Sequence, residues 1–271
     1  MFPRLFTTLT LALGLAGPAL ATEGTPDDPR LMTPGQLTVG TSDPVFPPWM
    51  MDNDPASGEG FESALIYELA EEMGFAPDQV VWVAQTFEQI IAPGPKPFDF
   101  AINQVSVTPA RAEVVTFSQI YLQPDKAVIA LPDAPVVGAD SFEALREARW
   151  GATIGTTDLT YLENVIGASG VMVYDDQAGV FQAMQAGQID ATVAALPTAL
   201  FATAVQIPEA DIFAILPADD NDPGHGLLFA YENPLVDWVD DALGALIARG
   251  AVDDMVDTWL VADPDLPVIS E

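Results

Sequence analysis

Residues 98–122 read FDFAINQVSVTPARAEVVTFSQIYL, and the interpretation of the whole chain starts from them. The first ten, 98–107, predict a strand that runs into a loop, and Pro109 suits the start of a helix. Arg111 follows at once, one of only 8 basic residues beside 40 acidic ones. A guanidinium is a planar fork that fits a carboxylate, so Arg111 indicates an anion site. The alternative is a surface arginine that pairs with Glu113.

On both sides of this segment, strands and helices alternate along the chain. One alternating run covers about 30–127 and a second about 130–218, and a further strand and two helices follow. Such alternation is typical of α/β folds with mainly parallel sheets. The simplest topology returns the C-terminal segment to the first unit. The prediction is two α/β lobes, 30–127 plus 222–271 and 130–218, joined by two crossing strands.

The N-terminus predicts export. Residues 1–21 hold one cation, an apolar stretch and small residues before Thr22, the pattern of a cleaved signal peptide. The alternative is a first structural helix. Cysteine is absent, which excludes a lipid-anchor cysteine and disulfides. The net charge of −32 opposes binding to nucleic acid and to anionic membranes. We therefore expect a soluble periplasmic protein.

Six segments, taken in order, resemble one known family. They are QLTVGTSDPVFPPW (36–49), GFESALIYELAEEMGF (60–75), the segment 98–122, WGATIGTTDLTYL (150–162), QAMQAGQIDATVAALPTA (182–199) and ARGAVDDMVDTWL (248–260). The chain resembles the periplasmic solute-binding proteins of ABC importers, family 3, in the polar amino-acid branch. This resemblance implies a type II periplasmic binding fold, or Venus flytrap, whose lobes close over a small ligand. It also implies a membrane permease as partner.

The resemblance places ligand-binding residues on the first lobe. Arg111 matches the arginine that grips the ligand's α-carboxylate, and Ser106 with the backbone around Asn103 would donate beside it. Phe46 and Phe87 match aromatic residues on either face of the ligand, with core packing as the alternative for both. The other members of this set are Asp43, where some relatives bind the α-ammonium, and Trp49, a possible wall.

On the second lobe, the resemblance implies a turn that closes on the same carboxylate. Gly155, Thr156 and Thr157 match the family's Gly-Thr-Thr, although a threonine there also serves as an ordinary helix cap.

One position departs from the family. Asp190 matches a structural aspartate, but Ala195 stands where the family has the aspartate that binds the α-ammonium. Asn103 and Gln104 also replace a smaller pair. Either Asp43, helped by Glu62, binds the amine, or the ligand is an amine-free or N-methylated carboxylate.

Other functions remain open at the level of sequence. An enzyme on this fold would need an acid or base in the cleft, for which Asp43, Glu62 and His225 are candidates, with His225 expected near the hinge. A sensor or redox accessory protein would look the same as an importer subunit. No cofactor or metal motif is present, so neither is expected, and the protein is expected to be a monomer.

Overall fold

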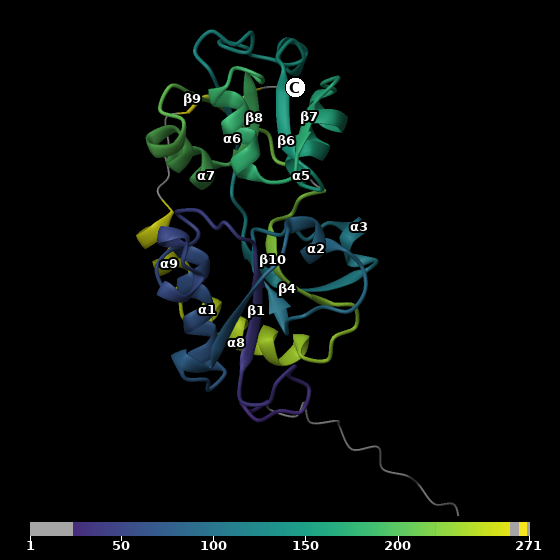
Figure 1. Cartoon of the computed structure of the whole chain (residues 1–271), viewed down its shortest axis with the longest axis vertical. Coiled ribbons are helices and arrows are strands. Elements are labelled where there is room, and N and C mark those ends of the chain that lie inside the picture. The colour runs from purple at the N-terminus through teal and green to yellow at the C-terminus, as the bar shows by residue number, and fades with distance from the viewer. Residues whose placement is uncertain (1–23, 220, 261–265, 270–271) are drawn as a thin grey trace, which may run out of the picture.

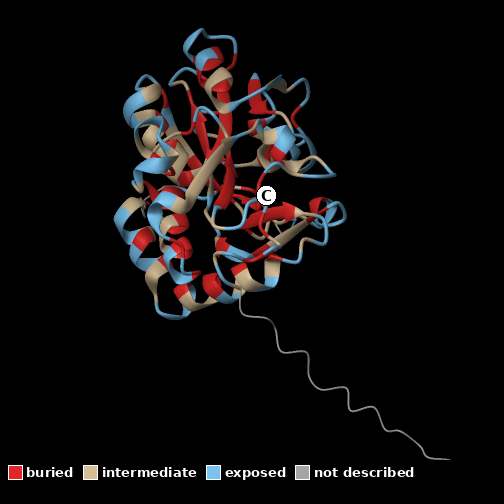
Figure 2. Ribbon diagram, turned by 60° about the horizontal axis from the view of Figure 1, so that its bottom comes forward, coloured by how far each residue is buried: buried red, intermediate tan, exposed pale blue. Residues whose placement is uncertain are grey.

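The computed structural model describes residues 24–219, 221–260 and 266–269, and the signal peptide predicted at 1–21 lies outside them. Figure 1 shows two lobes, one above the other, each built on its own sheet with helices against it. The sheets have five strands each, in the orders β2-β1-β3-β10-β4 and β7-β6-β8-β5-β9. Figure 2 shows that buried residues follow the strands and the inner faces of the helices.

The first sheet is parallel except for one strand. Its strands are β1 (Leu37–Thr41), β2 (Val80–Ala84), β3 (Phe100–Ala101), β4 (Val115–Leu122) and β10 (His225–Ala230). β1 pairs in parallel with β2 and β3, whereas β10 runs antiparallel to both β3 and β4. All five residues of β1 are buried, as a central strand covered on both faces requires.

Helices of the first lobe cover this sheet. They are α1 (Phe61–Glu72), α2 (Phe87–Ile91), α3 (Pro109–Ala112), α8 (Val236–Ala248) and α9 (Ala251–Trp259), with the 3-10 turns η1 (Met51–Asn53), η2 (Pro55–Ser57) and η3 (Pro77–Gln79). Leu65, Ile66 and Leu69 of α1 share one apolar core with Leu243 and Leu246 of α8. The helical spacing of these residues therefore predicts the face that is buried.

The second sheet repeats the same plan. Its strands are β5 (Lys126–Ala130), β6 (Trp150–Thr153), β7 (Met172–Tyr174), β8 (Ala191–Ala195) and β9 (Asp211–Leu216). Its helices are α4 (Phe142–Leu145), α5 (Thr157–Thr160), α6 (Gln177–Gln185) and α7 (Leu196–Phe201), and the π-helical turns η4 (Tyr161–Ile166) and η5 (Ala202–Gln206) extend α5 and α7. β6 is parallel to β7 and β8, and β5 is antiparallel to β8 and β9.

In each sheet, the reversed strand is the one that arrives from the other lobe. The chain leaves the first sheet along β4, crosses at 123–125 and enters the second as β5, and it returns from β9 to β10. Two crossings, as expected, connect the lobes, and four strands of each sheet run in the same direction.

The structure corrects two of the predicted lobe boundaries. Lys126 and Ala127 pair with β8 and β9 in the second sheet, although the boundary at 127 assigned them to the first lobe. The described C-terminal residues also return to the second lobe, because the Ile215 N–H of β9 donates to the Pro267 carbonyl and the Ile269 N–H donates to the Ile215 carbonyl. Ile269 is buried in the core of that lobe. A strand edge left open by β9 explains this return, since it offers unpaired backbone groups.

Two predicted elements differ in extent. Residues 98–107 form a strand that runs into a loop, as expected, but the strand is only Phe100–Ala101, and the loop that follows lines a cavity. Residues 115–122 form β4, a strand that was not predicted. Among the described residues, no helix is long and apolar enough to cross a membrane.

Candidate functional site

A cavity of about 480 Å³ lies between the two sheets and is lined by residues of both lobes. This volume is in the range of small-molecule sites. Ten of the predicted binding residues line it, namely Asp43, Phe46, Phe87, Asn103, Gln104, Ser106, Arg111, Thr156, Thr157 and Ala195. Gly155 touches the same site through its backbone, since its carbonyl accepts a hydrogen bond from Arg111. Trp49, Glu62 and His225 also line the cavity.

Arg111 is held at the boundary between the lobes. It lies on α3, whose start is capped by the Thr108 hydroxyl, which accepts from the Arg111 backbone N–H at 3.2 Å. Its Nη1 donates to the Ser106 carbonyl at 2.8 Å, and its Nη2 donates to the Gly155 carbonyl of the other lobe at 2.9 Å. The guanidinium lies 5.4 Å from the centre of the Phe87 ring. Arg111 thus links both lobes through one buried cation.

Burial sets the electrostatics of this arginine. Only 9% of Arg111 is exposed, and loss of solvent lowers its pKa, against the charges of Asp222 and Asp158, which raise it. An arginine stays protonated in proteins even so. Its hydrogen bonds to neutral carbonyls leave the positive charge available to an anion in the cavity.

In the turn on the second lobe, the hydroxyls of Thr156 and Thr157 make different contacts. Thr156 caps α5, because its Oγ1 accepts from the Leu159 N–H at 3.2 Å, and it donates to the Thr153 carbonyl at 2.7 Å. Thr157 instead faces the first lobe, where its Oγ1 lies 3.3 Å from the Ser106 Oγ. Gly155 has φ +73°, a conformation that favours glycine and aims this turn at the cavity. The hydroxyl that meets the other lobe is therefore that of Thr157.

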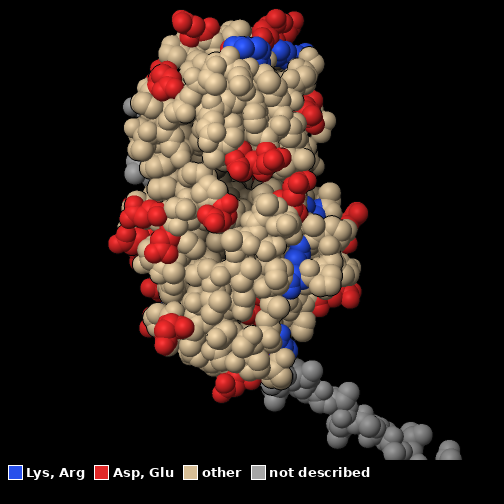
Figure 3. Space-filling view, viewed as in Figure 1, with Lys and Arg blue, Asp and Glu red and all other residues tan. Residues whose placement is uncertain are grey.

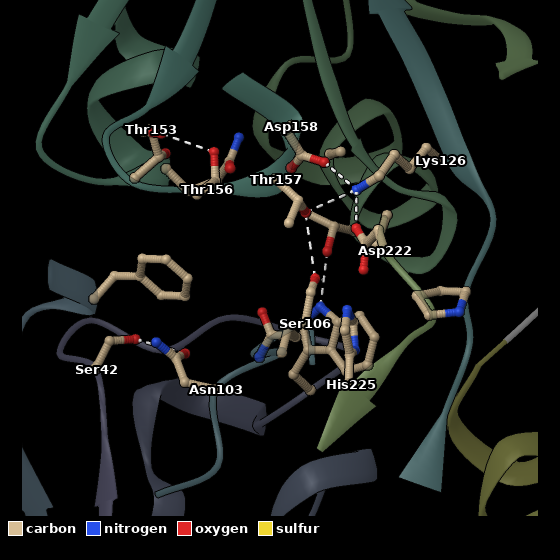
Figure 4. A pocket seen from close by; sticks show the side chains of 18 of the residues that line it. Ser42, Asn103, Ser106, Lys126, Thr153, Thr156, Thr157, Asp158, Asp222 and His225 are labelled. Carbon is tan, nitrogen blue, oxygen red and sulfur yellow. Dashed lines mark hydrogen bonds and ion pairs between the residues drawn. The ribbon is translucent and has the colours of Figure 1, made fainter. Parts of the chain in front are cut away.

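A charged cluster beside these hydroxyls was not predicted. The Lys126 ammonium lies 2.7 Å from a carboxylate oxygen of Asp158 and 2.8 Å from one of Asp222, and it donates to Thr157 Oγ1 at 3.1 Å (Figure 4). Burial alone would lower the pKa of Lys126, but the two carboxylates outweigh it and raise the pKa. The signal in the sequence that could have indicated this cluster is the scarcity of cations, because a lysine beside a predicted hinge is then an unusual residue.

Ala195 lies opposite this lysine. It ends β8 and is the direct cross-strand partner of Lys126 on β5. Position 195, where the resemblance implies a carboxylate, therefore carries only a methyl group, on the strand that pairs with Lys126. Asp43 and Phe46 also line the cavity, Asp43 exposed and Phe46 half-buried.

The floor of the first lobe is a buried network around Glu62. The Glu62 carboxylate accepts from the Gln104 backbone N–H at 2.7 Å, from the Tyr121 hydroxyl at 2.6 Å and from the Gln104 side chain. Burial raises the pKa of Glu62 to about 7, although these hydrogen bonds lower it. The Gln104 amide nitrogen is thus committed to Glu62, and Asn103 Oδ1 accepts from the Ser42 hydroxyl at 3.1 Å.

His225 opens β10 directly after the second crossing, near the hinge as expected, but it also lines the cavity, where it was not expected. Its ring packs on Trp49 and Tyr121, with centroids 5.9 and 6.2 Å away. Burial lowers its pKa to about 3, so the ring is neutral near pH 7. Among the described residues, no group of three His, Cys, Asp or Glu side chains is arranged to hold a metal ion.

Comparison with known proteins places this geometry in context. The sequence model of "Bacterial extracellular solute-binding proteins, family 3" matches residues 37–262. The lysine/arginine/ornithine-binding periplasmic protein of Escherichia coli (strain K12) is 26% identical over 188 residues, 68% of this chain and 67% of that protein. The L-cystine-binding protein TcyJ of the same strain is 23% identical over 94% of this chain and 93% of its own length.

The fold matches solved structures in the same way. An ancestral arginine-binding protein bound to glutamine aligns with a TM-score of 0.70 and 23% identity, covering 83% of this chain and 98% of that one. At this identity, the likeness concerns the fold.

Proposed function

The chain belongs to the bacterial extracellular solute-binding proteins of family 3, and from this premise we propose that it captures a small carboxylate-bearing solute between its lobes. Family membership assigns it to binding proteins rather than to enzymes. The observation that carries the proposal is Arg111, a buried cation at the lobe boundary that faces a cavity of about 480 Å³. A buried guanidinium next to hydroxyl donors suits a carboxylate.

The proposed mechanism is closure of the lobes over the solute. The carboxylate binds first to Arg111 and Ser106 on the first lobe, and the Gly155–Thr157 turn of the second lobe then closes over it. Contacts between the lobes support such a closed state, because Ser106 meets Thr157 and the Trp49 Nε1 donates to Thr198 Oγ1 at 2.7 Å. A solute that contacts both lobes favours the closed state by its differential affinity.

For the solute itself, an amino acid or a close analogue is the first proposal. Relatives of this chain are named for lysine, arginine, ornithine and cystine, which are α-amino acids. Asp43 is the carboxylate proposed to bind the α-ammonium.

An amine-free or N-methylated carboxylate is the second proposal, and one observation favours it. Ala195, the cross-strand partner of Lys126, offers no charge to an ammonium. Asn103 and Phe46 would then contact the neutral or methylated end of the solute.

The cellular setting follows the family. A relative is named as periplasmic, and we propose that this chain is exported through residues 1–21, works as a soluble monomer in the periplasm and delivers its solute to the permease of an ABC importer.

A thermal-shift screen tests the proposal. The mature chain is mixed with each common amino acid and with its deaminated and N-methylated analogues. A solute at about 1,000 times its Kd adds about 4 kcal/mol to the free energy of unfolding, which gives a clear shift in Tm. Shifts confined to primary amino acids favour the first solute class, and shifts with their analogues favour the second.

Arg111→Ala supplies the critical comparison in that screen. It should remove the shift, because loss of the partner of a buried charge costs about 2–5 kcal/mol of binding. Arg249→Ala is the matched control, since Arg249 is an exposed cation that pairs with Glu68 and Glu72 far from the cavity. If Arg111→Ala binds as well as Arg249→Ala does, the proposed carboxylate site is wrong.

A further inference from the structure

Asp222 is a carboxylate of the chain itself that lies inside the cavity. It belongs to the segment that returns from β9 to β10, and its side chain is 8% exposed. Lys126, which reaches it at 2.8 Å, is the first residue of β5, directly after the other crossing. The two crossings between the lobes are thus joined by an ion pair.

The donors around Asp222 are those that a ligand carboxylate would need. Ser106 of the first lobe and Thr157 of the second lie with their hydroxyl oxygens 3.3 Å apart, and Lys126 reaches the same Thr157 oxygen. Burial raises the pKa of the Asp222 carboxyl, but the Lys126 ammonium and, to a smaller extent, the neighbouring Thr157 and Ser106 hydroxyls lower it below its ordinary value. Figure 4 shows Ser106, Thr157 and Lys126 gathered around this carboxylate. One anion already occupies the point where the two lobes meet.

We propose that Asp222 is an internal competitor of the ligand: its carboxylate takes the donors of Ser106, Thr157 and Lys126, holds the empty lobes together, and leaves when a ligand carboxylate enters. This inference rests on the proposed function in its second half, because displacement presumes a carboxylate-bearing solute. The first half, closure without a solute, concerns the chain alone.

Because of electrostatic repulsion, a ligand carboxylate must displace the Asp222 carboxylate and cannot share its hydrogen-bond donors. Two carboxylates that approach the same pair of hydroxyls repel each other strongly in a buried site. Ser106 and Thr157 each have one hydroxyl proton to donate. A ligand carboxylate at this point therefore excludes the Asp222 carboxylate from it.

The structure also makes departure of Asp222 feasible. When Asp222 leaves, Lys126 keeps the carboxylate of Asp158 at 2.7 Å and is not left as an unpaired buried charge. Asp222 lies on a connection between strands rather than within one, next to Pro223 and Gly224, and connections move more easily than strands do. Loss of one of two carboxylates is thus tolerated by the cluster.

A tethered competitor sharpens the selection of solutes. A group held on the same chain acts at an effective concentration of about the millimolar range or higher. A solute must gain enough from Arg111 and the rest of the cavity to outcompete it. Simple monocarboxylates, which touch little else, are then poor ligands of the wild-type protein.

Small-angle X-ray scattering of the mature, solute-free protein tests the first half. The wild-type protein should be compact, and Asp222→Ala should have a larger radius of gyration because the lobes open. Asp175→Asn is the matched control, since Asp175 is an exposed acid that lines the same cavity away from the Lys126 cluster, and it should scatter like the wild type. Far-UV circular dichroism verifies that each variant is folded, and Asp222→Asn replaces Asp222→Ala if the latter is not.

Acetate is the probe for the second half. Sodium acetate at about 100 mM should return Asp222→Ala to the compact form, because the free carboxylate replaces the missing side chain, whereas sodium chloride at the same ionic strength should not. The wild type should not respond to either salt.

Three results would overturn the inference: a solute-free wild type as open as Asp222→Ala, equal opening of Asp175→Asn, or no response of Asp222→Ala to acetate. These measurements contain no amino acid, so they succeed or fail independently of the solute screen.

Discussion

Single residues show how burial, rather than proximity in sequence, sets the chemistry of this cavity. Glu62 comes early in α1, where a carboxylate is expected to be exposed and charged, yet it is fully buried under Gln104 and Tyr121. Gly60, two residues earlier at the start of α1, has φ +95°, and a Cβ there would lie 2.6 Å from the Trp49 carbonyl oxygen. The glycine therefore allows the close approach of two segments that buries the acid.

The buried acid predicts a pH dependence of stability. The folded-state pKa of Glu62 is about 7, above the ordinary value of 4.5, so its stabilising contribution is complete below pH 4.5 and is lost as the pH rises through 7. Glu62→Gln removes this loss and keeps most hydrogen bonds. We expect the free energy of unfolding of Glu62→Gln, relative to that of the wild type, to increase by about 3 kcal/mol between pH 4.5 and pH 8, measured by urea denaturation.

The titration of His225 does not affect the difference in stability between Glu62→Gln and the wild type. His225 has its folded pKa lowered to about 3, so its contribution is present above pH 6.5 and is lost as the pH falls. It is present in both proteins and cancels. Glu71→Gln, an exposed acid on the same helix, should show no gain, and an equal gain in both variants would contradict the role assigned to burial.

Short elements position the side chains around Arg111. The helix α2 has only five residues, and a helix of that length is not stable by itself. Its start is fixed by Thr86, whose Oγ1 accepts from the Gln89 N–H at 3.2 Å while the Gln89 side chain accepts from the Thr86 N–H at 2.9 Å. This capping box holds Phe87 over the guanidinium.

Loss of the cap should therefore be measurable in the stability of the protein. Thr86→Ala should lower the free energy of unfolding by about 1 kcal/mol, because the N–H of Gln89 loses its partner. Thr86→Ser keeps the hydroxyl and should stay close to the wild type in the same urea titration. Equal stability of all three proteins would mean that tertiary packing alone fixes α2.

At the scale of the whole molecule, charge of one sign dominates. Figure 3 shows acidic side chains spread over both lobes of one face, with few Lys or Arg among them. The chain carries a net charge of −32, and its acids repel one another in the compact state. The clustered cation Lys126 is buried and paired, so it does little to relieve repulsion across the surface.

Salt should consequently stabilise the protein. Raising NaCl from 10 to 500 mM shortens the screening length from about 30 Å to below 8 Å, and we expect Tm to rise by about 5 °C. Potassium chloride should act equally, because screening depends on ionic strength and not on the cation. A Tm that is flat or falls with salt would show that surface repulsion does not limit stability.

The sequence by itself determined the alternation of strands and helices, the two lobes and the set of residues around Arg111. The alternation and the two lobes depend on local patterns, namely periodicity and turn residues. The set of residues around Arg111 depends on the resemblance of six segments to a known family. Ten of the residues chosen in this way line one cavity. Their roles in binding stay predictions.

Only the tertiary structure decided how the charges in that cavity are paired. Lys126, Asp158 and Asp222 come from a strand, a helix and a connection that are far apart in the chain, and no local pattern links them. The pairing of β5 with the second sheet and the burial of Glu62 and His225 have the same origin. Electrostatic energies depend on distance and on solvent exposure, and both are defined only when the lobes have folded and met.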